Sequence, residues 1–303
     1  TEMHWAKLLA ALGVKQQDNT QMTSADYEFM KYITEYGKHY GTKAEYEYRL
    51  DLFKENLDHI ADHNSKNGET HELGINHMSD WSEEEYNKLL GYKPSMRTGL
   101  KESRVEILDT SNLADDMNWV DQGAVTPVKN QGQCGSCWAF STTGSIEGAE
   151  FLHGTKKLVS LSEQNLVDCS KQNDACKGGL MDYAFEYIES HPLMTEAAYP
   201  YTGHHSTFSK CKYEKSEGVG HVADYKDVTP KSLDQMKAAL AIGPVSIAIE
   251  ADKSVFQSYR KGVITSRTCG TKLDHGVLAV GYGTEDGEDY FLVKNSWGAS
   301  WGV

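Results

Sequence analysis

Apolar residues recur at helical spacing between residues 25 and 66, a stretch without proline. Gly37 and Gly41 interrupt the recurrence. The pattern therefore predicts two helices with a break at 37–41. The recurring positions are Phe29, Tyr32, Ile33 and Tyr36, followed by Leu50, Phe53, Leu57 and Ile60.

The next segments lose this helical period. Residues 68–80 contain alternation at Leu73 and Ile75, which favours a short strand. Residues 91–112 contain Gly91 and Pro94 among scattered charges without any period. We interpret residues 91–112 as an extended linker that a protease could cut.

Helical and strand patterns are segregated in the remainder of the chain. A helix is expected from Cys137 to just before Gly154, and Ser162 followed by Glu163 indicates the start of another. Apolar or alternating runs at 244–250, 276–283 and 290–293 predict strands. In this part of the chain the predicted helices therefore come first and the predicted strands later.

Composition narrows the class of protein. With 39% hydrophobic and 24% charged residues, the chain can form one or two sizeable cores. Uncharged apolar runs such as 8–14 are far shorter than the ~20 residues of a membrane-spanning helix. The net charge of −14 and the lack of a basic cluster argue against nucleic acid as a partner. Residues 4–14 fit either a remnant of a secretion signal or an amphipathic extra helix.

All six cysteines follow Asp116, and two of them form a C-x-x-C pair in GQCGSCWAFS. Cys134 and Cys137 could be a redox pair, half of a zinc site, or a bridging cysteine beside a nucleophile. A zinc site would need a second close pair, but Cys169 and Cys176 are seven positions apart. A redox pair would follow a strand, whereas 125–133 reads as a loop.

Distant residues favour the third interpretation. The segment CGSCW fits the signature C-G-[SA]-C-[WY], which is followed by His and Asn about 130 to 150 residues later. His275 lies 138 residues after Cys137, and Asn295 lies 20 further. With these motifs, and with LSEQNLVDCS, CKGGLMDYAF and VKNSWGASWG, residues 113–303 resemble the papain family. The resemblance implies a two-lobed α+β papain-like fold, with a helical left lobe and a β-barrel-like right lobe.

The resemblance assigns chemistry to five side chains. Cys137 would be the nucleophile, and because a thiol of pKa ~8.5 is mostly protonated in acid, it needs His275 and a helix N-terminus to favour its thiolate. Asn295 would fix the imidazole tautomer, and Trp297 would shield that hydrogen bond. Gln131 and the Cys137 backbone N–H would form an oxyanion hole.

The family pattern also implies a substrate cleft. Gly178 and Gly179 would pair with the substrate backbone as an added strand. An apolar pocket would hold the residue two before the cut bond. Its expected lining is Leu180, Met181, Ala248 and Leu273.

The remaining cysteines receive roles only through the resemblance. Cys137 would stay free, and the family partner of Cys269 would lie past Val303. We therefore expect a catalytic domain, residues 113–303, that is truncated at its C-terminus. The implied disulfides are Cys134 with Cys176 and Cys169 with Cys211.

A second resemblance covers residues 25–92. Six residues on one predicted helix face match the E-R-F-N-I-N motif of cathepsin L-like pro-segments, and four more match the motif that follows it. The pro-segment and its linker, 25–112, would form a helical cap, and 81–105 would cross the cleft against the substrate direction. The motif residues are Glu45, Arg49, Phe53, Asn56, Ile60 and Asn64, then Gly74, Asn76, Met78 and Asp80.

Together the resemblances imply the zymogen of an endopeptidase. Protonation of carboxylates, including Asp80 and the Glu45 partner of Arg49, would loosen the cap in acid. We expect a monomer of the secretory pathway, in an acidic lysosome-like vesicle or outside the cell, that acts on proteins or peptides without a cofactor. The role of residues 1–24 stays open. The alternatives are a catalytically silent, permanently capped binding protein and a free pro-segment, 25–105, that inhibits other proteases.

Two histidines on the second predicted helix raise the possibility of a metal site. His59 and His63 are spaced at i, i+4, but a solvated helix face is the more common use of this pattern. The segment HELGINH is not the zinc-peptidase motif H-E-x-x-H, because Ile75 stands where the second histidine must be. We therefore predict no metal.

Overall fold

The structure is a computed structural model that describes residues 21–99, 104–205, 210–265 and 268–303. The apolar segment 4–14 lies outside these residues. Within the described part, no helix combines the length and apolar character needed to cross a bilayer.

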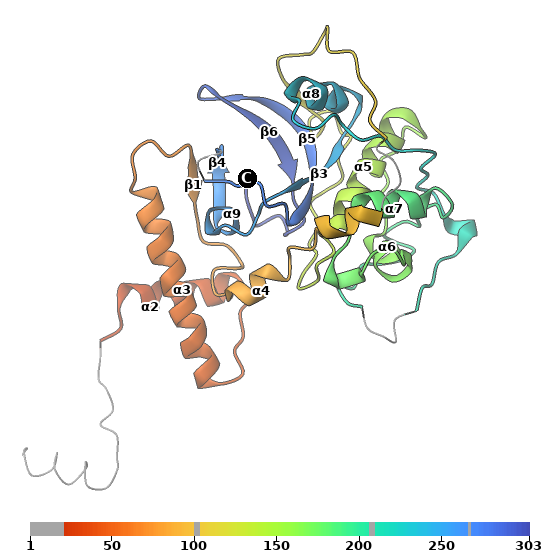
Figure 1. Cartoon of the computed structure of the whole chain (residues 1–303). Helices are drawn as coiled ribbons and strands as arrows, with labels where there is room; N and C mark the ends of the chain where they lie inside the picture. Colours follow the sequence, from red (N-terminus) through yellow and green to blue (C-terminus); the bar gives the residue numbers. More distant parts are fainter. Residues whose placement is uncertain (1–20, 100–103, 206–209, 266–267) are drawn as a thin grey trace, which may run out of the picture.

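The N-terminal region, residues 21–99, contains the two helices that its periodicity predicts (Figure 1). Thr23 and Asp26 form a reciprocal capping box at the first helix, and Gly37 has a φ of 60° in the break between them. Phe29 and Phe53, both with 0% exposure, join the two helices in one aromatic core. The elements are α2 (Ser24–Glu35), α3 (Lys43–Asn64), β1 (His71–Leu73), α4 (Glu83–Asn87) and the 3₁₀ helix η1 (Pro94–Gly99).

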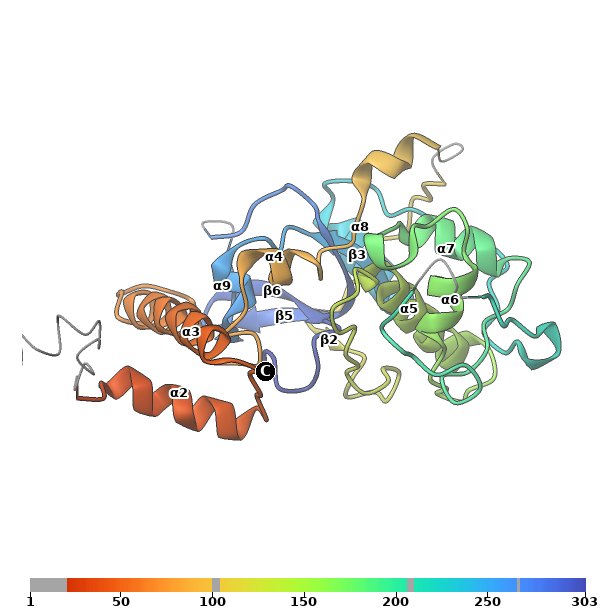
Figure 2. The ribbon, with the colours of Figure 1, turned by 90° about the horizontal axis from the view of Figure 1, so that it is seen from below.

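The C-terminal region, residues 113–303, separates into a helical lobe and a sheet lobe, which Figure 2 shows from below. The helical lobe contains α5 (Cys137–His153), α6 (Glu163–Cys169), the 3₁₀ helix η2 (Ala175–Lys177) and α7 (Met181–Ile188). The sheet lobe contains β2 (Met117–Asn118), α8 (Leu233–Ile242), β3 (Val245–Ile249), α9 (Ser254–Gln257), β4 (Tyr259–Gly262), β5 (His275–Glu285) and β6 (Glu288–Lys294). A further 3₁₀ helix, η3, spans Lys215–Glu217.

Strand β5 is the centre of the sheet lobe. It pairs antiparallel with β2, β3 and β6, and its first nine residues are buried. Helix α5 packs against it, since Ser141 Oγ donates to the Val277 carbonyl at 2.8 Å. A Cβ on Gly144 would lie 2.7 Å from Leu278 Cδ2, so a larger residue here would require the Leu278 side chain to move. This contact fixes the start of α5 relative to the start of β5.

Two disulfides brace the helical lobe. Cys134 bonds to Cys176, and Cys169 bonds to Cys211, the pairing that the papain resemblance implies. Cys137 and Cys269 are free thiols. The C-x-x-C spacing left three interpretations of Cys134 and Cys137 open. In the structure Cys134 is a bridging cysteine, and Cys137 is the free thiol beside it.

The N-terminal region docks on the sheet lobe. Strand β1 pairs antiparallel with β4, and Asn76 Nδ2 donates to the Gln257 carbonyl at 2.8 Å. Met78 is fully buried in a cluster that includes Ala251 and Trp297. Both views place α2 and α3 beside this lobe, away from the helices α5 to α7 (Figures 1 and 2).

Three sequence expectations are wrong. Residues 91–112 are not extended throughout, because η1 forms at Pro94–Gly99 and Arg97 reaches Asp182 at 3.3 Å. The salt bridge of Arg49 is with Glu85, not with Glu45, whose carboxylate instead accepts the Gly41 N–H at 2.9 Å. His63 is not on a solvated face, because it is 5% exposed and packs on β1.

Candidate active site

Cys137 is the first residue of α5 and is fully buried. Its Sγ accepts the backbone N–H of Gly276 at 3.3 Å. The loop before it is held by the disulfide of Cys134 and by the Gly135 N–H, which donates to the Cys176 carbonyl at 2.9 Å. The thiol therefore has a fixed position at a helix N-terminus, where partial positive charge favours an anion.

His275 and Asn295 meet at one end of the β5–β6 strand pair. His275 begins β5, and Asn295 follows the last residue of β6. Asn295 Oδ1 accepts from His275 Nε2 at 2.8 Å and from the Ser296 N–H at 2.8 Å. Because Nε2 carries the proton, Nδ1 retains a lone pair, and this buried atom has no hydrogen-bond partner among the described residues. The tautomer is the one that could take a proton from a thiol.

Trp297 covers this pair. Its ring centroid lies 4.8 Å from that of His275, and the side chain is 1% exposed. Tyr86 of the N-terminal region packs on the indole from outside, with 5.5 Å between ring centroids. The hydrogen bond between His275 and Asn295 is thus protected from water by aromatic rings.

Two donors orient the side-chain amide of Gln131, and a carbonyl of the N-terminal region accepts a hydrogen bond from its nitrogen. Its Oε1 accepts from Ser296 Oγ at 2.7 Å and from Trp297 Nε1 at 3.1 Å. Its Nε2 therefore faces the site, where it donates to the carbonyl oxygens of Leu89 and Cys134, each at 2.9 Å. The Leu89 carbonyl stands where a developing oxyanion would need this donor.

Residues 91–93 cross the site and pair with the backbone of Gly179 through an isolated bridge. The Gly179 N–H donates to the Gly91 carbonyl at 2.8 Å, and the Lys93 N–H donates to the Gly179 carbonyl at 3.1 Å. Tyr92 forms a parallel bridge with Gly179, and its N–H donates to the Asp274 carbonyl at 2.9 Å. The backbone of Gly179 is therefore used by the N-terminal region.

Glycines allow this close crossing. A Cβ on Gly91 would lie 1.9 Å from the Gly135 carbonyl oxygen, so no other residue fits there without movement of the backbone. Gly178 has a φ of 123°, and a Cβ on it would lie 2.6 Å from the Gly91 carbonyl oxygen. The segment around Gly91 therefore contacts the loops of Gly135 and Gly178 through backbone atoms.

Burial controls the protonation states of Cys137 and His275. It raises the pKa of the Cys137 thiol to about 11, against which the N–H groups of Gly276 and Gly91 act in the lowering direction. Burial also lowers the pKa of His275 to about 4, although its bond to Asn295 favours the charged ring. While the site is covered, thiol and imidazole are both neutral. The thiolate and imidazolium that the sequence suggests require water to re-enter.

Three of the four expected pocket residues come together. Leu180 and Met181 are buried in one cluster with Ala248, and Tyr92 and Met96 of the N-terminal region pack in the same cluster. Leu273 is 41% exposed and lies outside the cluster. The N-terminal region therefore contributes two apolar side chains to the core cluster that contains these three residues.

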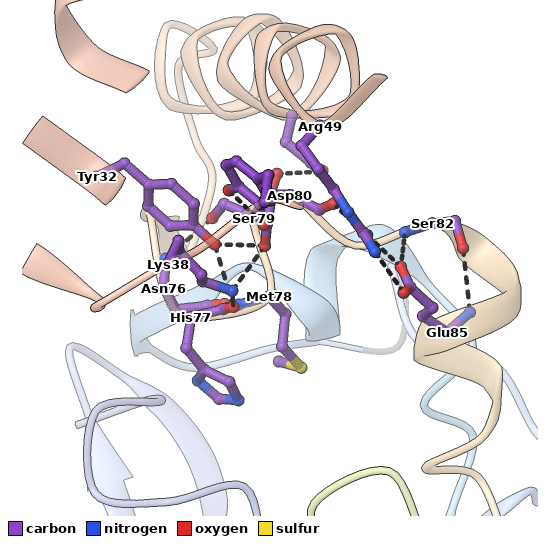
Figure 3. A network of polar contacts seen from close by, with 12 residues as sticks. Tyr32, Lys38, Arg49, Asn76, His77, Met78, Ser79, Asp80, Ser82 and Glu85 are labelled. Atoms are coloured by element: carbon purple, nitrogen blue, oxygen red, sulfur yellow. Dashed lines mark hydrogen bonds and ion pairs between the residues drawn. The ribbon is translucent and has the colours of Figure 1, made fainter. Parts of the chain in front are cut away.

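Polar side chains of the N-terminal region surround the buried carboxylate of the motif residue Asp80 (Figure 3). Asp80 is 2% exposed and accepts from Tyr32 Oη at 2.6 Å, Lys38 Nζ at 2.8 Å and Tyr40 Oη at 2.8 Å. Arg49 Nη1 donates to the Asp80 backbone carbonyl at 3.0 Å. Two charges and two phenols thus hold segment 76–80 against α2 and α3.

Arg49 also holds the start of α4. Its two terminal nitrogens reach Glu85 Oε2 at 2.5 Å and Oε1 at 2.7 Å. This bond lowers the pKa of Glu85 to about 2. Ser82 and Glu85 form a capping box at the same helix start. The pair therefore connects α3 to the segment that enters the site.

The other motif residues serve the same docking. Asn56 Nδ2 donates to the Ser79 carbonyl at 2.9 Å, and Asn64 exchanges two bonds with the backbone of Leu73, at 2.8 and 2.9 Å. Ile60 is 8% exposed. A Cβ on Gly74 would lie 2.9 Å from Arg260 Cδ. This face of α3 therefore contacts segment 71–80.

Several residues of the site were not found from sequence. Leu89 and Gly91 act through backbone atoms, which leave no signal in residue type. Tyr201 donates to the Gln131 carbonyl at 2.8 Å and is hydrogen-bonded to Ser136 Oγ at 2.7 Å, so it supports the loop before Cys137. Only Ser296 had a usable signal, since it lies within the motif KNSWG.

Comparison with known proteins identifies the family to which the two regions of the chain belong. Residues 113–303 match the Papain family cysteine protease domain, and residues 29–86 match the Cathepsin propeptide inhibitor domain (I29). Cysteine proteinase 5 of Dictyostelium discoideum is 41% identical over 98% of this chain and 90% of its own length. A cathepsin L-like protein of Caenorhabditis elegans is 43% identical over 93% and 86%. Probable cysteine protease RD21B of Arabidopsis thaliana is 44% identical, and the match spans 62% of its length.

Solved structures agree with the whole architecture. Digestive procathepsin L 3 of Tenebrio molitor larval midgut has a TM-score of 0.83 at 36% identity, over 93% of this chain and 91% of that one. The recombinant stem bromelain precursor has a TM-score of 0.84 at 35% identity, over 92% and 90%. The class is thus a cysteine peptidase that carries its propeptide, and the predicted α+β papain-like fold is confirmed. The chain belongs to the papain family of cysteine proteases.

Proposed function

We propose that the chain is an acid-activated endopeptidase zymogen in which Cys137 is the nucleophile and His275 the general base. One observation supports this most strongly: the Leu89 carbonyl accepts from Gln131 above the buried thiol. A pro-segment that occupies an oxyanion donor has a reason to do so only if that donor is used in catalysis.

The proposed reaction begins after the pro-segment leaves. His275 Nδ1 takes the thiol proton, and the thiolate adds to the substrate carbonyl carbon. Gln131 Nε2 and the Cys137 N–H stabilise the oxyanion. The imidazolium then protonates the departing amine, which leaves an acyl group on sulfur. Water, deprotonated by the same imidazole, hydrolyses this thioester and restores the thiol.

Inhibition would operate in two ways. The pro-segment takes the Gln131 donor, the Gly179 backbone and the apolar pocket at once, so a substrate finds none of them free. It also removes water, which keeps Cys137 and His275 neutral. Removal of the pro-segment would therefore both open the cleft and favour the charged pair.

Acid release requires a group that titrates in mildly acidic solution. Glu85 does not, because its pKa of about 2 keeps its contribution intact above the usual value of 4.5. His77 does, because burial and the nearby Lys38 lower its pKa from 6.5 to about 4, while Asp80 acts in the opposite direction. Trp81 packs edge-on against its ring at 5.7 Å. A half-buried neutral histidine beside the Asp80 network would act as an acid sensor.

The sign of this effect follows from linkage. The folded-state pKa of His77 is depressed, so its contribution to stability is complete above about pH 6.5 and is lost as the pH falls toward about 4. Replacing His77 with Gln should remove on the order of 2–3 kcal/mol of the pH-dependent loss in the free energy of unfolding. Urea denaturation of the chain between these pH values measures it.

His39 provides the control for this change, since it is an exposed histidine of the same region. His39→Gln should leave the pH profile as it is. An unchanged slope in His77→Gln would show that another group senses acid. The loss of the contact with Trp81 would lower stability at every pH, so the slope and not the absolute value is decisive.

Substrate choice should follow the apolar cluster. Burial of a Leu or Phe side chain against Leu180, Met181 and Ala248 contributes about 1.5 to 3 kcal/mol, whereas Arg would lose hydration there. We expect a preference for Leu or Phe over Arg of roughly ten- to a hundredfold in kcat/KM at the second position before the cut bond. Fluorogenic peptides that differ only at this position test it after acid treatment, and a preference for Arg would contradict the pocket assignment.

The compartment is part of the proposal. Two disulfides in the helical lobe favour an oxidising route through the secretory pathway. An acid-sensing pro-segment would be useful in a lysosome-like vesicle or in acidic surroundings outside the cell. The natural partners would be protein or peptide substrates, with the enzyme acting as a monomer.

A further inference from the structure

Three side chains with metal-binding atoms gather where α3 meets β1, far from Cys137 in sequence. His63 lies in the last turn of α3, His71 begins β1, and Glu69 lies in the turn between them. One ligand atom from each lies within 4.8 Å of the other two. The two imidazole centroids are 4.5 Å apart. Nothing in the proposed peptidase reaction uses this cluster.

The histidines are in an unusual state for buried groups. His71 is 6% exposed, and both of its ring nitrogens are buried without a hydrogen-bond partner among the described residues. Burial of an imidazole without partners is costly, and such a group calls for an explanation. A metal ion bound to one nitrogen would supply it.

His63 has the orientation of a metal ligand. Its Nε2 lies 3.2 Å from the His71 backbone carbonyl, which can only accept. Nε2 must therefore carry the proton, and Nδ1 is left with its lone pair. Ligating histidines ordinarily donate their other ring N–H to a carbonyl or carboxylate in this way.

The surroundings carry an excess of negative charge. A cavity next to Glu69 and His71 is also lined by Glu285 and Asp286. Both of its lysines have ion-pair partners outside the cluster, since Lys66 pairs with Asp62 at 2.8 Å and Lys261 pairs with Glu72 at 2.9 Å, although Lys66 also interacts electrostatically with Glu69. Across the described residues, no salt bridge neutralises Glu69, Glu285 or Asp286. A cation entering through this cavity would meet a favourable potential.

We propose that His63, Glu69 and His71 form a divalent transition-metal site, with zinc as the ion whose chemistry fits best. Two imidazoles and a carboxylate, with water in the fourth position, are a known zinc ligand set. Ligand atoms around tetrahedral zinc lie about 3.3 Å apart. The cluster needs to contract slightly, which the partly exposed Glu69 side chain allows.

The site would connect two parts of the fold. His71 pairs with Gly262 in the ladder between β1 and β4, so it belongs to the contact between the pro-segment and the sheet lobe. A metal shared with His63 would fasten the end of α3 to that contact. Bound zinc should therefore stabilise the docked pro-segment, an effect that does not depend on peptide hydrolysis.

Calorimetric titration of Zn²⁺ into the full chain tests the proposal. The Cys137→Ala background removes the catalytic thiol, which could bind zinc itself. We expect one zinc ion per chain, and a loss of at least tenfold in affinity in Glu69→Gln and in His71→Asn. Zinc should also raise the unfolding temperature of the parent chain but not of these variants.

His39→Asn is the matched control, because it removes an exposed histidine from the same region. It should bind zinc as the parent does. Glu69→Gln changes a partly exposed side chain and therefore tests the site even if His71→Asn folds poorly. No zinc binding by the parent chain, or equal binding in parent, Glu69→Gln and His71→Asn, would overturn the proposal.

Discussion

Replacement of Cys137 with alanine is expected to lower kcat for peptide hydrolysis by a factor on the order of 10⁶, the loss found when a protease loses its nucleophile. The thiol is the one side chain of the site that can form the acyl intermediate, since His275 and Asn295 are already engaged with each other. The assay compares acid-treated parent and variant with the same fluorogenic peptide. The variant should keep its fold, because alanine fits within the volume of the buried cysteine.

Cys269 is the matched control for this experiment, because it is the other free thiol among the described residues. It lies near the Glu250 carbonyl, 3.8 Å from its sulfur, and takes no part in the proposed chemistry. Cys269→Ala should retain hydrolysis. Activity that survives in Cys137→Ala, or is lost in Cys269→Ala, would contradict the assignment of the nucleophile.

The second large effect is expected from Asp80→Ala, which should destabilise the docked pro-segment by about 3–5 kcal/mol. The change leaves the Lys38 ammonium, 17% exposed, without its counter-charge. It also leaves the phenols of Tyr32 and Tyr40 without their acceptor. The pro-segment should then release near neutral pH. Urea denaturation in the Cys137→Ala background measures the loss of stability without self-cleavage.

An exposed ion pair of the same region gives the comparison. Lys31 and Glu28 are 2.7 Å apart, but their side chains are 71% and 41% exposed. Glu28→Ala should cost less than about 1 kcal/mol, because water screens the pair. Equal effects of Glu28→Ala and Asp80→Ala would show that the buried network does not hold the pro-segment.

Periodicity and capping signals made part of the fold predictable. Helices α2 and α3 show a helical period with glycine between them, and Ser162 accepts the Asn165 N–H at the start of α6 as its position indicated. Helix α7 was not predicted, because Leu180 precedes it without a side-chain cap. Helix α8 had an overlooked signal, since Ser232 accepts the Gln235 N–H at its start.

Contacts between residues distant in sequence could not be predicted from the local sequence pattern. Arg49 has Glu45 one turn before it, yet it pairs with Glu85, 36 residues away in sequence. His63 looked like a surface residue because its helix is polar, but β1 covers it. The four proposed catalytic side chains could be named through the papain resemblance. The carbonyl of Leu89 could not, because every residue has a carbonyl.

The central proposal is that the pro-segment covers Cys137, which is already able to react, until acid releases the pro-segment. Peptide mapping after exposure to an epoxide-type thiol trap tests this most directly, before and after acid treatment. We predict that Cys137 carries the trap only in the acid-treated chain. Equal modification of Cys137 before acid, or none after it in a chain that remains folded, would contradict the proposal.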